Sequence, residues 1–313
     1  MAWAPPNLLA RTGTAKAIAV VEPRAEAGQT GRWRAGAKLN LFLHVTARRA
    51  DGYHCLDSLV VFTELADTIM VEAAEDLSLA ITGPFAAGLP TDGRNLVMRA
   101  AELLARAAGI TARGRIGLHK MLPVAAGIGG GSADAAAALL ALRALWQVPI
   151  DDAGLDDLAV RLGADVPVCL RAGPCMISGI GHDVAGAPAL PSFALLLANP
   201  NLALATADVF KHLAVPLQPP EPWPQDPVPD LASALGRTRN DLEPAARQLA
   251  PVVGEVLAEL AALPHCQLAR MSGSGATCFG LFDDLSAART GAGKLAARRK
   301  NWWIRASAVQ GVG

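Results

Sequence analysis

Apolar and polar side chains alternate between residues 37 and 45. Lys38 and Asn40 fall on one face of this segment, whereas its leucines and Val45 fall on the other. A period of two predicts a β-strand, on which side chains two positions apart lie about 7 Å from each other. Further strands are predicted over 59–62, 68–72, 77–81, 115–121, 193–198, 267–271, 277–282 and 302–305.

Helical patterns separate several of these strands. They predict helices over 96–107, 132–146, 152–162, 240–263 and 285–298, and a short helix from about residue 206. Asn95 or Asp92 is expected to cap the first helix and Asp151 or Asp152 the third, because short polar side chains accept hydrogen bonds from the free amides at a helix start. The strand–strand–helix–strand order near the C-terminus indicates a two-layer α+β unit.

Two stretches lack this regularity. Residues 1–35 mix Trp, Pro and Gly with one short apolar run, and we interpret them as a poorly ordered extension or the result of a start codon assigned too early. Residues 216–229 hold seven prolines and are predicted to form a surface loop. A length of 313 residues suggests about two domains, which we place at 36–190 and 191–313.

Charge and composition narrow the function classes. Lys and Arg together number 28, as do Asp and Glu, so the formal net charge is zero. Binders of nucleic acids or membrane surfaces need an excess of positive charge, so neither partner is expected. The most apolar runs, at 135–142 and 193–198, are too short to cross a bilayer.

The cysteines give no sign of a metal site or a disulfide framework. They are scattered and odd in number, and none belongs to a C-x-x-C pair: Cys55, Cys169, Cys175, Cys266 and Cys278. We interpret them as buried thiols of a reducing compartment. The sequence therefore predicts a cytoplasmic protein, and no metal ligand can be named from it.

A glycine-rich turn between a strand and an alanine-rich helix is the strongest functional signal. It consists of Pro123, Val124, Ala125, Ala126, Gly127, Ile128, Gly129, Gly130, Gly131, Ser132 and Ala133. Glycines leave amide groups uncovered and allow positive φ angles, so several N–H groups can point at one anion. The positive end of the following helix dipole adds to the attraction. These features predict a binding site for the phosphates of a nucleotide.

Three other interpretations of this turn fit less well. A Walker loop requires a lysine before Ser or Thr, and the turn has none. The dinucleotide fingerprint G-x-G-x-x-G meets Ser132 in place of its third glycine. A flexible linker does not usually run into so strong a helix former.

Two charged residues each allow two interpretations. Asp165 is either an exposed or capping carboxylate in a loop, or a base that accepts a hydroxyl proton, because its apolar neighbours would raise the pKa of an unpaired carboxylate. Lys38 is either solvated on its strand or directed into a pocket. Gly52-Tyr53-His54 is a weak signal by itself, and Ser272-Gly273-Ser274-Gly275 is a second turn of small residues suited to a hairpin or to a close approach to phosphate.

Taken together, these segments resemble the GHMP kinase superfamily. The resemblance covers about residues 36–306 in the family's order, and it rests on six segments: 37–41, 49–54, 123–133, 162–167, 204–207 and 271–276. The triple glycine and the Gly-Tyr-His segment are similar to one branch of the superfamily. Enzymes of that branch phosphorylate the 2-hydroxyl of cytidine diphosphate methylerythritol in non-mevalonate isoprenoid synthesis.

The resemblance implies a two-domain α+β fold, with an N-terminal domain like domain 2 of ribosomal protein S5 and a ferredoxin-like C-terminal domain. It implies that Asp165 takes the hydroxyl proton and that Lys38 holds Asp165 and the hydroxyl. ATP would bind on residues 123–133, and Gly273, Ser274 and Gly275 would close the pocket. The positions that match substrate contacts are Asn40, Tyr53, His54, Lys120 and Thr206, with Tyr53 and His54 around the cytosine.

This chain departs from the family pattern at two kinds of position. Ala205 replaces a common serine and Phe210 a common tyrosine, at one edge of the substrate site. Glycines also fill the places where other branches use a serine to bind Mg²⁺, so Mg²⁺ is expected to be held mainly by the phosphates. Asp134 could be a ligand, but it more simply complements the helix N-terminus.

Other functions stay open on the sequence alone. One is a GHMP kinase of the homoserine or mevalonate type, another is a nucleotide sensor without catalysis, and a third is an S5-like RNA-binding protein. The expected partner is a small-molecule substrate, and the chain is expected to be a monomer or a homodimer.

Overall fold

The computed structural model describes residues 31–181, 183–213, 230–311 and the single residues 217, 223 and 228. Residues 1–30 and most of the predicted proline-rich loop lie outside the described residues. The first strand begins at Gly31, so the last five residues of the predicted extension belong to the sheet. Buried and exposed side chains alternate in this segment, as expected of a strand, but the glycines hid this pattern in the sequence. Trp33 and Ala35 are buried, whereas Arg32 and Arg34 are exposed.

The first sheet contains seven strands of the described chain. They are β1 (Gly31–Asn40), β2 (His44–Arg48), β3 (His54–Glu72), β4 (Leu77–Thr82), β5 (Gly114–His119), β6 (Cys175–Gly179) and β7 (Asp183–Gly186). Strand β3 is central, because β1, β2, β5 and β6 all pair with it. The two strands predicted at 59–62 and 68–72 are therefore one strand of 19 residues. The predicted strand at 37–45 is divided between β1 and β2.

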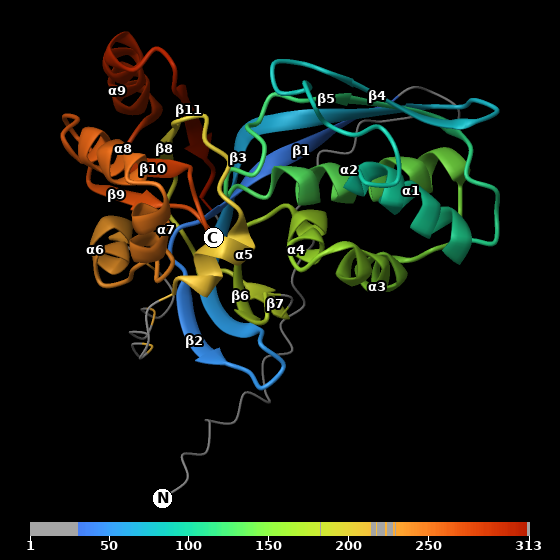
Figure 1. The fold of residues 1–313 in the computed structure, drawn as a ribbon, viewed down its shortest axis with the longest axis horizontal. Coiled ribbons are helices and arrows are strands. Elements are labelled where there is room, and N and C mark those ends of the chain that lie inside the picture. The colour runs from blue at the N-terminus through green and yellow to red at the C-terminus, as the bar shows by residue number, and fades with distance from the viewer. Residues whose placement is uncertain are drawn as a thin grey trace, which may run out of the picture.

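Four helices accompany this sheet: α1 (Leu96–Ala107), α2 (Gly130–Trp146), α3 (Asp152–Leu162) and α4 (Val166–Arg171). Figure 1 shows α1 and α2 lying along one face of the sheet. The predicted caps are present, since Asn95 accepts from the amide of Val97 and Asp151 from that of Gly154. Six of the nine buried residues of helix α2 are alanines, which lets it pack close to β1 and β3.

The second sheet has four antiparallel strands in the order β11-β8-β10-β9. They are β8 (Phe193–Asn199), β9 (Leu268–Met271), β10 (Cys278–Phe282) and β11 (Trp303–Val309). The helices of this part are α5 (Thr206–Lys211), α6 (Leu231–Gly236), α7 (Glu243–Leu249), α8 (Val252–Ala261) and α9 (Leu285–Arg298). The β-α-β-β-α-β order confirms the ferredoxin-like prediction. The single helix predicted over 240–263 is two helices, because Pro251 lacks the amide that would continue α7.

The two sheets share one apolar cluster. Leu39, Leu41 and Phe42 of the β1–β2 segment pack with Leu195 and Phe279 of the second sheet. The first sheet ends at Gly186 and the second begins at Phe193, on either side of residue 190. The domain boundary itself stays a prediction.

The cysteine prediction was partly wrong. All five thiols are free, but only Cys169, Cys175 and Cys278 are buried, whereas Cys55 and Cys266 are partly exposed. Within the described part of the chain, no helix has the length and apolar character needed to span a membrane.

Arg270 ties the β1–β2 segment to the second sheet. Its buried guanidinium donates to the carbonyl of Leu41 at 2.9 Å, to that of Leu235 at 2.9 Å and to the carbonyl and hydroxyl oxygens of Thr238 at 2.7 and 2.8 Å. Burial lowers the pKa of Arg270 to about 10, with the charge of Glu243 opposing the shift. The group therefore stays charged at neutral pH.

We expect Arg270→Met to lower the free energy of unfolding by about 2–4 kcal/mol, because buried carbonyls lose their donor. Urea denaturation measures the change. The control is Arg115→Met, which removes an exposed ion pair with Glu72 and should cost less than about 1 kcal/mol. Equal losses in the two variants would contradict the importance of the Arg270 hydrogen bonds.

Candidate active site

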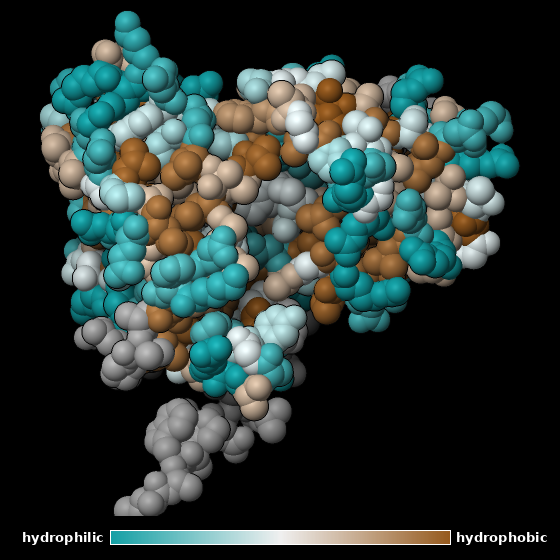
Figure 2. All heavy atoms as spheres, viewed as in Figure 1, coloured by the Kyte–Doolittle hydropathy of each residue, from teal (hydrophilic) through white to brown (hydrophobic). Residues whose placement is uncertain are grey.

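A cavity of about 960 Å³ opens between the two sheets. Figure 2 shows the hollow near the centre of the molecule. Its volume is at the upper end of the range for small-molecule sites, and its wall is mostly apolar with a few polar side chains. The cavity draws residues from β1, the β2–β3 turn, the glycine-rich turn, the loop between α3 and α4, α5 and the turn after β9.

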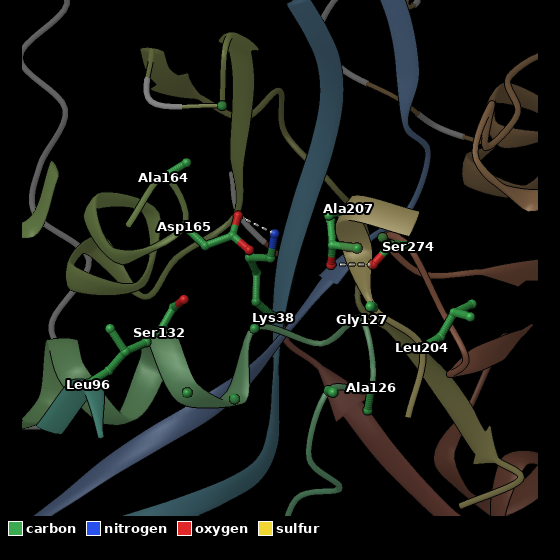
Figure 3. A pocket seen from close by; sticks show the side chains of 18 of the residues that line it. Lys38, Leu96, Ala126, Gly127, Ser132, Ala164, Asp165, Leu204, Ala207 and Ser274 are labelled. Atoms are coloured by element: carbon green, nitrogen blue, oxygen red, sulfur yellow. Dashed lines mark hydrogen bonds and ion pairs between the residues drawn. The ribbon is translucent and has the colours of Figure 1, made fainter. Parts of the chain in front are cut away.

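Lys38 and Asp165 meet in this cavity. The Lys38 ammonium donates to Asp165 Oδ1 at 2.8 Å, as Figure 3 shows. Lys38 is 4% exposed, at the end of β1, whereas the side chain of Asp165 is 41% exposed. Burial lowers the pKa of Lys38, but the charge and the hydrogen bond of Asp165 outweigh it, so the pKa is raised overall. Lys38 is therefore an ammonium ion at neutral pH.

Asp165 occupies the N-cap position of α4, but its side chain makes no capping hydrogen bond. Its partner is Lys38 instead, so the interpretation of Asp165 as a capping carboxylate is wrong. The apolar run after it, which the sequence left unassigned, forms α4 and packs against α2. This packing fixes the position of the carboxylate opposite β1.

Nine of the eleven residues of the glycine-rich turn line the cavity, and their contact with a nucleotide stays a prediction. Gly127 and Gly129 have φ angles of 73° and 64°, which only glycine adopts readily. Helix α2 begins at Gly130, two residues earlier than predicted, so the free amides of its first turn belong to small residues on the cavity wall. Ile128 and Ala133 are buried and lie outside the wall.

The turn after β9 packs directly against the glycine-rich turn. A Cβ on Gly127 would lie 2.6 Å from the carbonyl oxygens of Ser272 and Gly275, so no other residue fits there. Gly273 and Ser274 line the cavity, and Ser274 shares a 2.8 Å hydrogen bond with Thr206 (Figure 3). Gly275 is buried and does not reach the wall.

The β2–β3 turn brings Tyr53 and His54 to the cavity. Tyr53 is 62% exposed. His54 stacks on Phe210 of α5, with 4.9 Å between the ring centroids and 26° between the planes. Burial, followed by the charge of Arg48, lowers the pKa of His54, so its ring is neutral at pH 7. The stacked rings of His54 and Phe210 form an uncharged part of the cavity wall, which Tyr53 also lines.

Asn40 is 1% exposed and lines the cavity beside Lys38. Its amide nitrogen donates to Ser58 Oγ at 2.8 Å, which leaves the side-chain oxygen as an acceptor. Within the described residues, Asn40 Oδ1 has no hydrogen-bond partner. Asn40 Oδ1 is therefore a buried acceptor that no donor of the described residues uses.

Lys120 lies under the glycine-rich turn. Its buried ammonium pairs with Asp67 and, at 2.7 Å, with Asp134 Oδ2. A Cβ on Gly130 would lie 3.2 Å from the Lys120 nitrogen. The carboxylate of Asp134 is thus engaged by Lys120, and the idea that it mainly complements the helix N-terminus is incomplete. A substrate contact for Lys120 stays a prediction.

Several cavity residues were missed by sequence reasoning. Asn95 was recognised only as a helix cap, yet it lines the cavity with Pro90, Arg94 and Leu96. Leu96 comes within 3.8 Å of the position of a Cβ on Gly131, a proximity that only the packing of α1 on α2 produces. Phe210 appeared only as a departure from the family pattern, and no sequence signal indicates its stacking on His54.

The donors for Mg²⁺ are few. Among the described residues, no group of three or more His, Cys, Asp or Glu could hold a metal ion. The cavity wall offers the Ser132 hydroxyl and the Asp165 carboxylate as oxygen donors. Such a set suits Mg²⁺ that brings phosphate oxygens and water as its other ligands.

The fold and the glycine-rich turn on the cavity wall are those of a two-domain small-molecule kinase. A family model for the N-terminal domain of GHMP kinases matches residues 95–173, and one for their C-terminal domain matches residues 227–301. The chain belongs to the GHMP kinase family. Kinases of this family use ATP as the phosphoryl donor.

Three similar proteins place the chain within the family. A 4-diphosphocytidyl-2-C-methyl-D-erythritol kinase of Paramagnetospirillum magneticum is 52% identical over 272 residues, covering 86% of this chain and 95% of that protein. One of Rhodospirillum rubrum is 51% identical and covers 88% and 91%. A crystal structure of 4-(cytidine 5'-diphospho)-2C-methyl-D-erythritol kinase has a TM-score of 0.73 at 37% identity, covering 90% and 100%.

More distant kinases share the fold alone. Homoserine kinase from Cytophaga hutchinsonii superposes with a TM-score of 0.69 at 17% identity, covering 91% of this chain and 96% of that one. The predicted fold class is confirmed by these matches.

We expect Gly129→Ala to reduce kinase turnover about tenfold or more, because small displacements at a reacting centre are costly. The new Cβ would lie 3.1 Å from the Lys38 Cβ and 3.3 Å from its Cε. Gly109→Ala is the matched control, since Gly109 has a similar φ of 68° and nothing within 4 Å of its Cβ position. Steady-state kinetics measure the turnover of each variant. An equal loss of turnover in both variants would show that backbone strain, and not contact with Lys38, is responsible.

Asp134 gives a prediction about pH. Burial raises the pKa of Asp134 to about 7, with the attraction of Lys120 opposing the shift and the charge of Asp67 adding to it. The unfolded carboxyl ionises near pH 4, so between about pH 4 and pH 7 the unfolded state releases a proton that the folded state keeps. This group therefore makes stability fall as pH rises through that window.

In Asp134→Asn, this contribution disappears, and we expect the free energy of unfolding to fall less between pH 4 and pH 7 than in the wild type. Urea midpoints at several pH values measure the slope. Asp152→Asn, at a fully exposed carboxylate of α3, should keep the wild-type slope. An unchanged slope in Asp134→Asn would refute the raised pKa.

Proposed function

We propose that this chain transfers the γ-phosphoryl group of ATP to the 2-hydroxyl of 4-diphosphocytidyl-2-C-methyl-D-erythritol. One observation carries the proposal: the Lys38–Asp165 ion pair shares a cavity with the glycine-rich turn and with the aromatic surface of Tyr53, His54 and Phe210. The names of relatives about half identical over most of the chain support the same substrate.

Asp165 and Lys38 divide the proton chemistry. The oxygen of the substrate hydroxyl attacks the γ-phosphorus, and the partly exposed carboxylate of Asp165 accepts the proton of that hydroxyl. The bond from the γ-phosphorus to the oxygen of the β-phosphate breaks, and ADP is released. Lys38 keeps its own proton. Its ammonium fixes Asp165 and stabilises the negative charge that develops on the attacking oxygen.

The glycine-rich turn of residues 123–133 holds the triphosphate through those main-chain amides that are free on the cavity wall. The first amides of α2 lack helical partners, and they point along the positive end of the helix dipole. Residues 273–275 close the pocket over the phosphates. The phosphate oxygens would be the main ligands of Mg²⁺, with the Ser132 hydroxyl as a donor from the protein, and the bound ion would supply neutralisation of the phosphate charge.

The far end of the cavity fits a nucleobase. Flat rings at Tyr53, His54 and Phe210 suit stacking on cytosine, and a neutral His54 can both donate and accept a hydrogen bond. Asn40 Oδ1, which has no partner among the described residues, accepts from the methylerythritol moiety. Thr206 and Lys120 complete the proposed substrate contacts.

The alternatives have less support. Homoserine kinase and mevalonate kinase resemble the chain at 17% and 14% identity, which speaks for the fold and not for their substrates. The zero net charge disfavours an RNA-binding role, and the Lys38–Asp165 contact disfavours a sensor without catalysis. We further propose domains at 36–190 and 191–313, a cytoplasmic location, and a monomer or homodimer.

The decisive experiment is a coupled ADP-release assay with ATP, Mg²⁺ and each candidate alcohol, followed by identification of the phosphorylated product. Turnover with the cytidyl alcohol, and none with homoserine or mevalonate, is expected. Phosphorylation of homoserine or mevalonate without the cytidyl compound would overturn the proposal.

We expect Asp165→Asn to lower kcat by about 10²- to 10⁴-fold with the fold intact, because the amide cannot accept the hydroxyl proton. Asp156→Asn is the matched control: Asp156 is 37% exposed, pairs with Arg171 at 3.2 Å and lies outside the cavity wall. Near wild-type kcat in Asp165→Asn would remove Asp165 from its role.

A further inference from the structure

Ser272 lies behind the cavity wall, directly after β9. It is fully buried, at 0% exposure, and it is not part of the wall, although its neighbours Gly273 and Ser274 are. Ser272 therefore cannot touch a ligand in the cavity. Any effect on the reaction must pass through the residues it contacts.

The Ser272 hydroxyl joins two segments of the site. It donates to the carbonyl of Gly127 at 3.1 Å and accepts from the backbone amide of Asn40 at 3.1 Å. An amide N–H can only donate and a carbonyl can only accept, so the bridging group must do both. A hydroxyl meets this requirement, and an alanine methyl does not.

The two bridged segments carry the chemistry of the site. Gly127 belongs to the glycine-rich turn, and Asn40 follows Lys38 by two residues in β1. The backbone amide of Lys38 also donates to the carbonyl of Ile128 at 2.9 Å. The end of β1 is thus tied to the glycine-rich turn twice, once directly and once through Ser272.

The hydroxyl itself is held in a fixed place. The Ser272 amide donates to the carbonyl of Thr277 at 2.9 Å, and its carbonyl accepts from the amide of Gly275 at 3.0 Å. On either side, the Asn240 side chain donates to the carbonyls of Met271 and Gly273, both at 2.8 Å. A bridge anchored this firmly can set the spacing of the groups it joins.

We propose that Ser272 is a positioning residue for phosphoryl transfer, whose hydroxyl sets the distance between the nucleotide-binding turn and the strand that carries Lys38. The inference rests on the proposed function. Without the hydroxyl, the Asn40 amide and the Gly127 carbonyl lose their buried partner and the two segments are free to shift. Both phosphate binding and the alignment of Lys38 then suffer.

The test compares Ser272→Ala with Ser307→Ala. Ser307 is 2% exposed, and its hydroxyl also accepts from a backbone amide, that of Glu64 at 3.0 Å, and donates to a carbonyl, that of Ala308 at 3.1 Å. It lies on β11, outside the cavity wall. The pair therefore separates the loss of a buried hydroxyl bridge from the loss of this particular bridge.

In Ser272→Ala, we expect kcat/KM to fall about 10- to 100-fold, with a lower kcat and a weaker affinity for a non-hydrolysable ATP analogue in calorimetry. Ser307→Ala should stay within about twofold of the wild type in both measurements, although its Tm falls comparably. Ser272→Thr, which retains a hydroxyl, should recover most of the lost kcat.

Three results would overturn the inference. The first is a Ser272→Ala variant with the kinetics and the analogue affinity of the wild type, and the second is a loss of activity in both Ala variants in proportion to their loss of Tm. The third is a Ser272→Thr variant that has a normal Tm but the reduced kcat of Ser272→Ala. Failure of the wild type to phosphorylate the cytidyl alcohol would instead count against the proposed function. The analogue affinities of the variants would still decide whether Ser272 sets the nucleotide-binding turn.

Discussion

The ion pair between Lys38 and Asp165 is the interaction on which the site depends. Burial lowers the pKa of Lys38, and the charge and hydrogen bond of the nearby carboxylate outweigh burial and raise it overall. The two residues are 127 positions apart in the chain. They meet because α2 packs on β1 and carries α4 with it, so the architecture of the first sheet is what places a charge beside a carboxylate at the cavity wall.

Small side chains make this arrangement possible. The alanine face of α2 lets the helix approach β1 closely, and Gly129 leaves just enough room for the aliphatic part of Lys38. At Gly127 the main chain meets the turn after β9 so closely that a Cβ would overlap its carbonyl groups. The same absence of side chains exposes the amides that can bind phosphate. Close packing and the proposed phosphate binding thus both depend on one sequence feature.

The sequence predicted what depends on local pattern. Regular periodicity located most strands and helices, and the glycine-rich turn located part of the cavity wall. It could not show that residues 54–72 form one strand, because their burial changes along the strand as different neighbours cover it. Nor could it show the stacking of Phe210 on His54 or the ion pairs of Lys120, since these contacts join segments whose meeting depends on how the sheets pack.

The two partners of the ion pair are also unequally exposed, so that a ligand can approach one of them more easily than the other. Lys38 is buried and fixed by its backbone bond to Ile128, whereas Asp165 keeps 41% of its side chain open to the cavity. A hydroxyl that enters the cavity can therefore reach the carboxylate while the ammonium stays behind it. Because the ammonium is buried and already paired with the carboxylate, the charge separation that the proposed proton transfer needs is in place in the structure. The enzyme's preorganisation lies in this asymmetry.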